Sequence, residues 1–141
     1  MKLYTFYKIT SINKLITAFY IGSTKNLKNR IASHKHNAKA YPDRKVYRYI
    51  NNNGGFDNFE FITLFTTECS KNKKSRIEAS LIINFKASLN IQIPLRTQEQ
   101  YYSDNIDKIK DYYQANKERR IAYQKEYYRN NNLKLLKEIL N

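Results

Sequence analysis

Residues 19–34 gather a tyrosine, an arginine and a histidine in a spacing that could do chemistry on a charged substrate. Arg30 and His34 lie four residues apart, so on a helix they project in similar directions. A guanidinium holds an anion with a planar set of donors, and an imidazole or a phenol can exchange a proton. If this stretch forms a strand, a tight turn and a helix, Tyr20, Arg30 and His34 reach one surface.

A hairpin of two strands would carry the tyrosines. Residues 3–10 are mostly strand-forming types, residues 11–14 are turn-forming types, and residues 16–22 have the composition of a returning strand. Short connections favour antiparallel neighbours, so we expect Tyr7 and Tyr20 to lie near each other across the hairpin.

A helix over residues 25–39 would carry the arginine and the histidine. Ser23 or Thr24 can cap it by accepting a hydrogen bond from its free N–H groups. Leu27 and Ile31 lie four residues apart and share a face that should be buried. The arginine and the histidine lie on a neighbouring face.

The remainder of the first part predicts a short helix, a strand and a second helix. Residues 44–52 form the short helix, and residues 59–66 are apolar on both alternating faces, which predicts a central strand covered on both sides. A helix over residues 74–86 has an apolar stripe at four-residue spacing, with Glu78 beside it. The stripe consists of Ile77, Leu81 and Phe85. Pro94 ends the domain.

The composition points to a polyanionic partner. The 141 residues include 26 Lys and Arg against 12 Asp and Glu, a formal net charge of +14. Part of this excess fits AT-rich coding or solubility, but a charge of this size attracts nucleic acid. The single cysteine, Cys69, excludes an intramolecular disulfide framework. No stretch approaches the ~20 apolar residues of a membrane span, and no apolar signal segment is present, so we expect a soluble, intracellular protein.

Composition changes after Leu95, which predicts a domain over residues 1–95 and a Tyr/Lys-rich helical tail over residues 96–141. A Tyr-Tyr-x-x-Asn unit begins at Tyr101, Tyr112 and Tyr127, at spacings close to three and four helical turns. Two interpretations stay open. The tail packs on the domain or on a second copy as a homodimer, or it is an aromatic and basic arm along nucleic acid.

The ordered set of residues across the first 95 positions resembles the GIY-YIG endonuclease family. The family's second triplet is intact as Tyr20-Ile21-Gly22. Its first triplet, Gly-Ile-Tyr, corresponds to Thr5-Phe6-Tyr7, which keeps only the tyrosine. Four further positions of the family pattern are matched, in order along the chain, by Arg30, His34, Glu78 and Asn90.

This resemblance implies an α+β fold, a small three-stranded antiparallel sheet flanked by helices. It also implies hydrolysis of DNA phosphodiester bonds with one divalent metal ion, Mg²⁺ or Mn²⁺, bound by Glu78. The metal would stabilise the leaving 3′ oxygen. Tyr7 would activate the water, directly or through His34, and a nearby positive charge from Lys8, Arg30 or the metal would lower the pKa of its hydroxyl.

The other matched residues have roles implied by the same resemblance. Tyr20 would position the water or a phosphate, and Arg30 would clamp the scissile phosphate. Asn90 would fix the geometry of the site or touch the backbone, and Gly22 would be structural, a close turn or a backbone approach that a Cβ would obstruct. Five lysines would bind nucleic acid by phosphate contacts: Lys8, Lys25, Lys28, Lys35 and Lys39.

Two alternatives to an endonuclease remain at this point. One is a catalytically weak nucleic-acid-binding module with the same fold, and the other is an interaction protein whose tail mediates contacts. A viral or mobile-element origin would suit so short a nuclease. No zinc finger or helix-turn-helix offers a sequence reader, so specificity for a DNA sequence or structure stays open.

Overall fold

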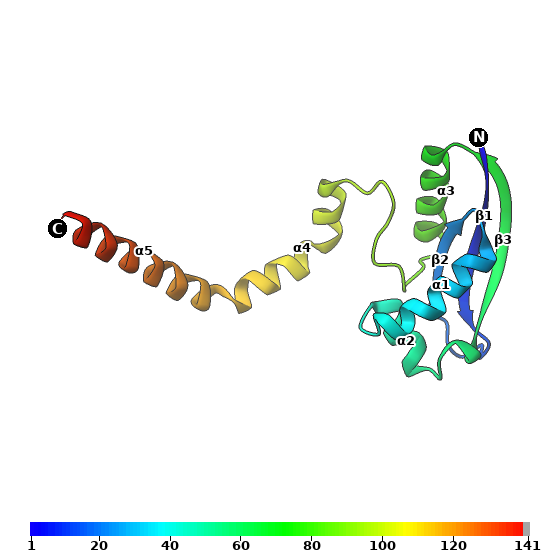
Figure 1. The fold of residues 1–141 in the computed structure, drawn as a ribbon, viewed down its shortest axis with the longest axis horizontal. Helices are drawn as coiled ribbons and strands as arrows, with labels where there is room; N and C mark the ends of the chain where they lie inside the picture. Colours follow the sequence, from blue (N-terminus) through cyan, green and yellow to red (C-terminus); the bar gives the residue numbers. More distant parts are fainter. Residues whose placement is uncertain (140–141) are drawn as a thin grey trace. The chain divides into compact units, whose positions relative to one another are not determined.

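The chain divides into two compact units in a computed structural model that describes residues 1–139, with side chains through residue 132. The first unit is Met1–Arg96, and the second begins at Thr97 (Figure 1). That these units are a nuclease domain and a separate tail stays a prediction.

A three-stranded antiparallel sheet forms the centre of the first unit. Its strands are β1 (Lys2–Ser11), β2 (Phe19–Thr24) and β3 (Phe59–Cys69), and β1 lies between the other two. The predicted hairpin is therefore confirmed. Its second strand begins later than predicted, because the N–H of Ile16 donates to the carbonyl of Asn13 (3.0 Å) within the connecting loop.

The prediction that residues 59–66 form a central strand was wrong, because β3 lies at an edge of the sheet. Phe59 is buried, whereas Ile62, Leu64 and Phe65 are exposed. Phe65 still contributes, since its ring stacks on Phe6 with centroids 4.9 Å apart. Apolar residues on both faces of a strand thus do not by themselves distinguish a central strand from an edge strand.

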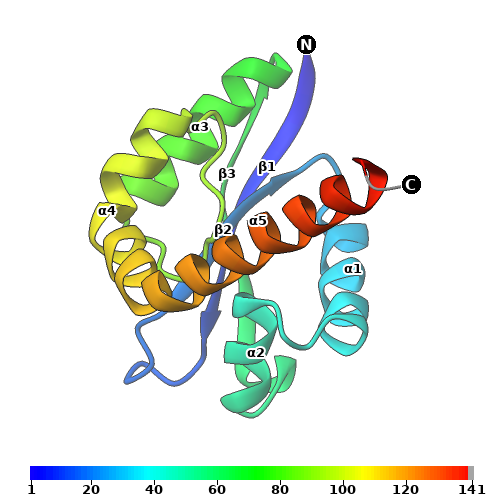
Figure 2. The ribbon, with the colours of Figure 1, turned by 90° about the vertical axis from the view of Figure 1, so that its left-hand side faces the viewer.

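Helices pack on both faces of the sheet (Figure 2). The helical elements of the first unit are α1 (Leu27–Ala40), α2 (Lys45–Asn52), the short 3₁₀ helix η1 (Phe56–Asn58) and α3 (Lys71–Asn84). Alternate residues of β1 point to opposite faces. Tyr7 and Ile9 pack with residues of α1 and α2, and Tyr4 and Phe6 pack with Cys69 and residues of α3.

The cap of α1 differs from the prediction. Asn26 is the N-cap, and its side chain accepts a hydrogen bond from the N–H of Asn29 (3.0 Å), so neither Ser23 nor Thr24 caps the helix. Thr24 instead closes the bend before it, where its hydroxyl accepts a hydrogen bond from the N–H of Asn26 (3.2 Å).

The last helix of the first unit starts earlier than predicted. The Ser70 side chain accepts a hydrogen bond from the N–H of Lys73 (3.2 Å), and this cap starts α3 at Lys71. The predicted apolar stripe is wrong at Phe85, which follows the end of the helix and is exposed. Ile82 is the buried residue of α3.

The second unit consists of α4 (Gln98–Ala115) and α5 (Lys117–Ile139), so the tail is a pair of helices. Thr97 and Gln100 form a reciprocal capping box at the start of α4, and Asn116 lies at its end. None of the residues of α4 is buried, nor is any residue of α5 up to residue 132. In the described part of the chain, no helix combines the length and the apolar character that a membrane crossing requires.

Candidate active site

The hydroxyl of Tyr7 is the centre of a hydrogen-bonded cluster between β1 and α1. Arg30 Nε donates a hydrogen bond to this oxygen at 2.9 Å, and His34 Nε2 lies 2.8 Å from it. Both partners project from α1 one helical turn apart, as the sequence spacing predicted. The phenol, the guanidinium and the imidazole are therefore in direct contact.

The pairing of β1 with β2 brings the two predicted tyrosines together. Tyr7 pairs with Gly22 and Ile9 pairs with Tyr20, so both tyrosine rings lie on the same face of the sheet. Their centroids are 6.4 Å apart. The register of β1 with β2 therefore places Tyr7 and Tyr20 close together, as expected.

Gly22 makes room for the Tyr7 ring. A Cβ at this position would lie 2.6 Å from the Tyr7 hydroxyl oxygen and 2.9 Å from Cε1 of Tyr20. The expectation of a structural turn was wrong, because Gly22 lies inside β2 and the chain bends only after Thr24. The expected close approach is present, and the group that approaches is the tyrosine of the opposite strand.

His34 is enclosed by aromatic rings and is 2% exposed. Four rings lie with centroids 5.6 to 5.9 Å from its own; they belong to Tyr7, Tyr20, Tyr47 and Phe61. The helix face that carries His34 is buried, with Ala38 one turn further on. This face includes Leu27, so the histidine lies on the packed side of α1 rather than on a separate polar face.

Tyr47 is the site residue that the sequence analysis missed. Its hydroxyl lies 3.1 Å from His34 Nδ1, and the residue is 4% exposed. It belongs to α2, three residues before the buried Ile50, and residues three apart share a helix face. That spacing is the signal that could have found it. The histidine thus has a hydroxyl against each ring nitrogen.

Burial controls the protonation of this cluster. Desolvation raises the pKa of Tyr7 above its usual range, the neighbouring Tyr20 adds to the rise, and the hydrogen bond from Arg30 opposes it. Desolvation likewise raises the pKa of Tyr20. The prediction that Arg30 lowers the pKa of Tyr7 was wrong in its net result, because the effect of burial exceeds that of Arg30.

The histidine shifts in the other direction. Desolvation lowers the pKa of His34 to about 4, and the charge of Arg30 contributes. At neutral pH the imidazole is therefore uncharged, with a proton on only one of its nitrogens. The cluster contains one fixed positive charge, on Arg30, surrounded by neutral groups.

Glu78 supplies the negative charge next to the cluster. Its carboxylate contributes to raising the pKa of Tyr7 and of Tyr20, after the larger effect of their burial. The Ser23 hydroxyl and Lys74 Nζ (3.3 Å) both donate to Oε2 of Glu78. Among the described residues, no hydrogen bond reaches the second oxygen, Oε1.

The donor set fits a weakly held hard cation. In the described part of the chain, no group of three or more His, Cys, Asp or Glu side chains is placed to bind a metal ion. A single carboxylate with an unused oxygen is what Mg²⁺ commonly takes from a protein, since this ion keeps several of its waters and also binds substrate phosphate. The residues present are therefore compatible with one such ion at Glu78.

Asn90 is bonded to the backbone of β2. Its side-chain oxygen accepts from the N–H of Ile21 (2.9 Å), and its side-chain nitrogen donates to the carbonyl of the same residue (2.8 Å). The adjacent Leu89 donates its N–H to the carbonyl of Phe19 (3.1 Å). The segment thus holds the open edge of β2 on either side of Tyr20.

The five predicted nucleic-acid-binding lysines fall into two environments. Lys8 lies on the opposite face of β1 from Tyr7, and its Nζ is 4.2 Å from the centre of the Phe19 ring. The other four, all exposed, are Lys25, Lys28, Lys35 and Lys39. Contact with Lys2 and the charge of Lys71 lower the pKa of Lys25, which marks a concentration of positive charge beside the start of α1.

The two residues that depart from the first triplet, Thr5 and Phe6, lie in the paired part of β1. Phe6 is fully buried with Tyr4 and Cys69 on the α3 side of the sheet. Thr5 pairs with Thr24 and Thr66 in the two neighbouring strands. Phe6 therefore packs on the opposite face of β1 from Tyr7, and Thr5 is paired on both sides within the sheet.

Comparison with protein families gives one match: the model of the GIY-YIG catalytic domain covers residues 3–90, more than half of the chain. No curated protein matches significantly, and no solved structure does either. A domain of this type indicates a nuclease in general, and such nucleases generally use a divalent metal and act on DNA. The match agrees with the three-stranded antiparallel sheet and its flanking helices. The chain therefore belongs to the GIY-YIG family, and its first unit contains a GIY-YIG catalytic domain.

Proposed function

We propose that the protein is a divalent-metal-dependent endonuclease that hydrolyses phosphodiester bonds in DNA. The observation that carries this proposal is the Tyr7 hydroxyl held between Arg30 Nε and His34 Nε2, with Glu78 close enough to affect its pKa. Hydrolysis of a phosphodiester needs a proton acceptor for water, a cation for the phosphate and help for the leaving oxygen. The cluster offers the first two, and a metal ion held by Glu78 would supply the third.

Tyr7 and His34 form the path for the proton of the attacking water. A neutral phenol is a weak base, and burial keeps Tyr7 neutral. His34 Nε2 solves this problem, because it accepts the hydroxyl proton of Tyr7 while the phenol oxygen takes a proton from the water. The water oxygen then forms the new bond to phosphorus, and the bond from phosphorus to the 3′ oxygen breaks. Burial, which lowers the pKa of His34 to about 4, keeps the imidazole neutral at neutral pH, so the lone pair of Nε2 is free.

Tyr47 accepts the proton of His34 Nδ1, which leaves Nε2 available to Tyr7. The Tyr7 oxygen already accepts a hydrogen bond from Arg30, so its own hydrogen is directed to His34 Nε2. The proton of the neutral imidazole then belongs on Nδ1, from which it is donated to the Tyr47 hydroxyl oxygen. In this arrangement each of the three hydrogen bonds joins one donor to one acceptor.

Arg30 and Tyr20 bind the scissile phosphate. Arg30 is half-buried; burial alone would lower its pKa, but the hydroxyls of Tyr7 and Tyr20 more than compensate and raise it. Its Nε is used by Tyr7, and its terminal nitrogens provide donors for a phosphate. Tyr20 lies beside it on the same face of the sheet and positions the water or a phosphate oxygen.

Glu78 would hold the metal ion. When bound, such an ion neutralises the charge that develops on the leaving 3′ oxygen. The chain's own contribution is to keep the carboxylate oriented, through the bonds that Ser23 and Lys74 make to Oε2.

The decisive experiment is cleavage of supercoiled plasmid and of a branched oligonucleotide, with Mg²⁺ or EDTA. We expect metal-dependent nicking that falls at least about a hundredfold in Glu78→Ala while DNA binding is kept. Glu68→Ala removes an exposed carboxylate from β3 and serves as the charge-matched control, with activity unchanged.

Two outcomes would contradict the proposal. Binding without cleavage by the folded wild-type protein on both DNAs would identify a nucleic-acid-binding module of the same fold. Little DNA affinity together with a mass that depends on the second unit would identify an interaction protein. The homodimer through that unit stays a prediction, to be checked by sedimentation.

A further inference from the structure

The second unit contains two helices of opposite charge. By sequence, α4 has two basic and four acidic residues, whereas α5 has seven basic and three acidic residues. No residue of α4 is buried, and none of α5 up to residue 132 is. These helices therefore present their side chains to a partner or to water, and only α5 has a charge that suits a polyanion.

Arginine and tyrosine side chains share one face of α5. A groove of about 760 Å³ lies along this face, lined by Arg119, Arg120, Tyr123, Gln124, Tyr127 and Tyr128. No carboxylate lines it, although Glu118 and Glu126 belong to the same helix. The groove combines planar cations with exposed rings, and Tyr123 is 71% exposed.

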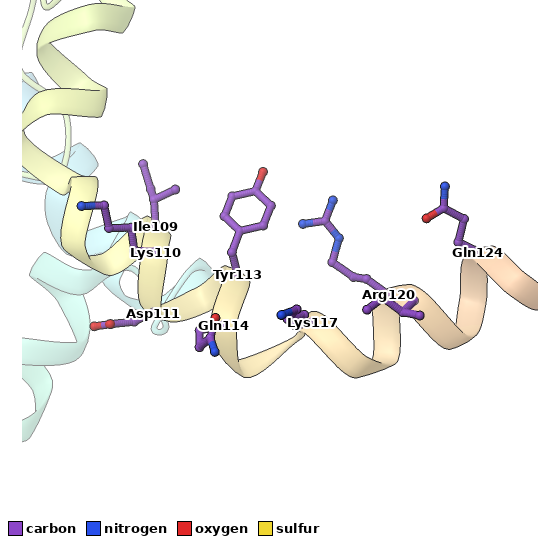
Figure 3. A pocket seen from close by; sticks show the side chains of 9 residues that line it. Ile109, Lys110, Asp111, Tyr113, Gln114, Lys117, Arg120 and Gln124 are labelled. Atoms are coloured by element: carbon purple, nitrogen blue, oxygen red, sulfur yellow. The ribbon is translucent and has the colours of Figure 1, made fainter.

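The face continues across the junction of the two helices. Figure 3 shows Tyr113 of α4 and Arg120 and Gln124 of α5 extending from the same side of the ribbon. The guanidinium carbon of Arg120 lies 4.6 Å from the centre of the Tyr113 ring. Arg120 and Gln124 line both this junction groove, of about 840 Å³, and the groove along α5, so the two grooves form one surface.

We propose that this basic and aromatic face of α5 binds a DNA strand, with the arginines on phosphates and the tyrosine rings stacked on exposed bases. Guanidinium groups make bidentate bonds to phosphate, and aromatic rings stack on any base, so the combination binds a strand without reading its sequence. The face thus holds the nucleic acid that the first unit cuts. The choice of DNA, rather than another polyanion, rests on the proposed function.

The test is the affinity of the full chain for fluorescently labelled single-stranded and double-stranded DNA, measured by anisotropy at several salt concentrations. All chains carry Glu78→Ala to prevent cleavage. We expect Arg119→Ala with Arg120→Ala to weaken binding about tenfold near physiological salt and to reduce the salt slope by about two phosphate contacts. Tyr123→Ala with Tyr127→Ala should weaken binding to single strands by at least tenfold.

The matched control is Lys125→Ala with Arg129→Ala. It removes the same charge from the same helix, at positions that do not line the groove. We expect a change of less than about threefold, with the helix content unchanged by circular dichroism. Equal losses of affinity in the Arg119/Arg120 variant and in the Lys125/Arg129 control would show attraction by net charge alone and would overturn the proposal.

Two further outcomes are informative. If the arginine variant binds DNA normally but dissociates a dimer in sedimentation, a second copy occupies the face and the proposal is wrong. Plasmid cleavage by chains with Glu78 intact is scored separately. If no chain cuts DNA but the arginine variant still loses affinity, the proposed nuclease function fails while this inference stands.

Discussion

At the scale of single residues, Arg30 and His34 determine which hydrogen bond the Tyr7 hydroxyl accepts and which it donates. Arg30 can only donate a hydrogen bond, so the phenol oxygen accepts from it and its own proton is left for His34. The neutral histidine then needs an acceptor for the proton on its other nitrogen, and Tyr47 provides one. The direction of each hydrogen bond follows from the first.

Tyr47→Phe tests this arrangement, because it removes the hydroxyl and keeps the ring. We expect kcat to fall about tenfold with KM little changed, since substrate does not contact Tyr47 in the proposed mechanism. The ¹⁵N chemical shifts of His34 should move from one tautomer toward a mixture of both. A purely structural role would leave those shifts unchanged.

The control for this substitution is Tyr49→Phe in the same helix. Tyr49 packs edge-on against Phe59 and makes no ring contact with the histidine among the contacts described for it. Its activity and the tautomer of His34 should match the wild type. Equal kcat values for both variants would argue against a role of Tyr47 in positioning the imidazole.

His34 also predicts how stability depends on pH. Its folded pKa of about 4 lies below the value of about 6.5 in the unfolded chain, so the unfolded chain binds more protons between these values. Stability from this group is therefore present above pH 6.5 and is lost as the pH falls toward 4. Between pH 7 and pH 4.5 the loss should be about 2.5 kcal/mol.

Urea unfolding at pH 7 and pH 4.5 measures this loss. His34→Gln lacks the titrating group, so its free energy of unfolding should change with pH by about 2.5 kcal/mol less than that of the wild type. The same pH dependence in both proteins would mean that other groups, and not the buried imidazole, are responsible.

Sequence reasoning found most of this cluster and missed one member. Tyr7 and Tyr20 follow from a hairpin, and Arg30 and His34 follow from the spacing within one helix, so each is a local inference. The spacing from Ile50 could place Tyr47 on the buried face of α2, but its contact with His34 depends on how α2 packs against α1, which no local pattern encodes. The predicted direction of the Tyr7 pKa shift was wrong for a similar reason, because burial depends on tertiary packing.

At the scale of elements, β2 is a short edge strand that carries Tyr20 of the candidate site. Asn90 replaces a neighbouring strand there, since its amide makes both hydrogen bonds that a paired backbone residue would make to Ile21. The sequence identified Asn90 as part of the set but could not show that its partner is the backbone of β2. The edge position of β3 was missed as well, because strand order depends on connections rather than on apolar pattern.

Asn90→Ala should therefore affect both stability and activity. Loss of two bonds to the backbone should lower the free energy of unfolding by about 2 kcal/mol. The freed edge of β2 should also displace Tyr20 and lower kcat. Asn84→Ala is the control, since its side chain only bonds the exposed Ser80 hydroxyl (3.1 Å), and it should cost less than about 0.5 kcal/mol.

At the scale of the whole molecule, the two units differ in how they use apolar residues. The clusters of buried residues lie within the first unit, whereas no described residue of the second unit is buried. Folding of the first unit should therefore not depend on the second. The sequence indicated this division through the change of composition after Leu95.

A chain that ends at Arg96 tests this independence. We expect the same urea midpoint as the full chain in near-UV circular dichroism, because every core contact is retained. Its affinity for single-stranded DNA should fall at least tenfold, because the face on α5 is lost. A broad transition at lower urea would show that the second unit contributes to the stability of the first.

The close approach of Tyr7 to Gly22 has a consequence for sequence variation. The phenol of Tyr7 occupies the volume that a Cβ at position 22 would need, so these two positions are coupled. While the tyrosine is kept, any residue other than glycine opposite it would force the Tyr7 ring to move. Where the phenol is lost, the glycine is free to change, so the two positions should covary among descendants of this chain.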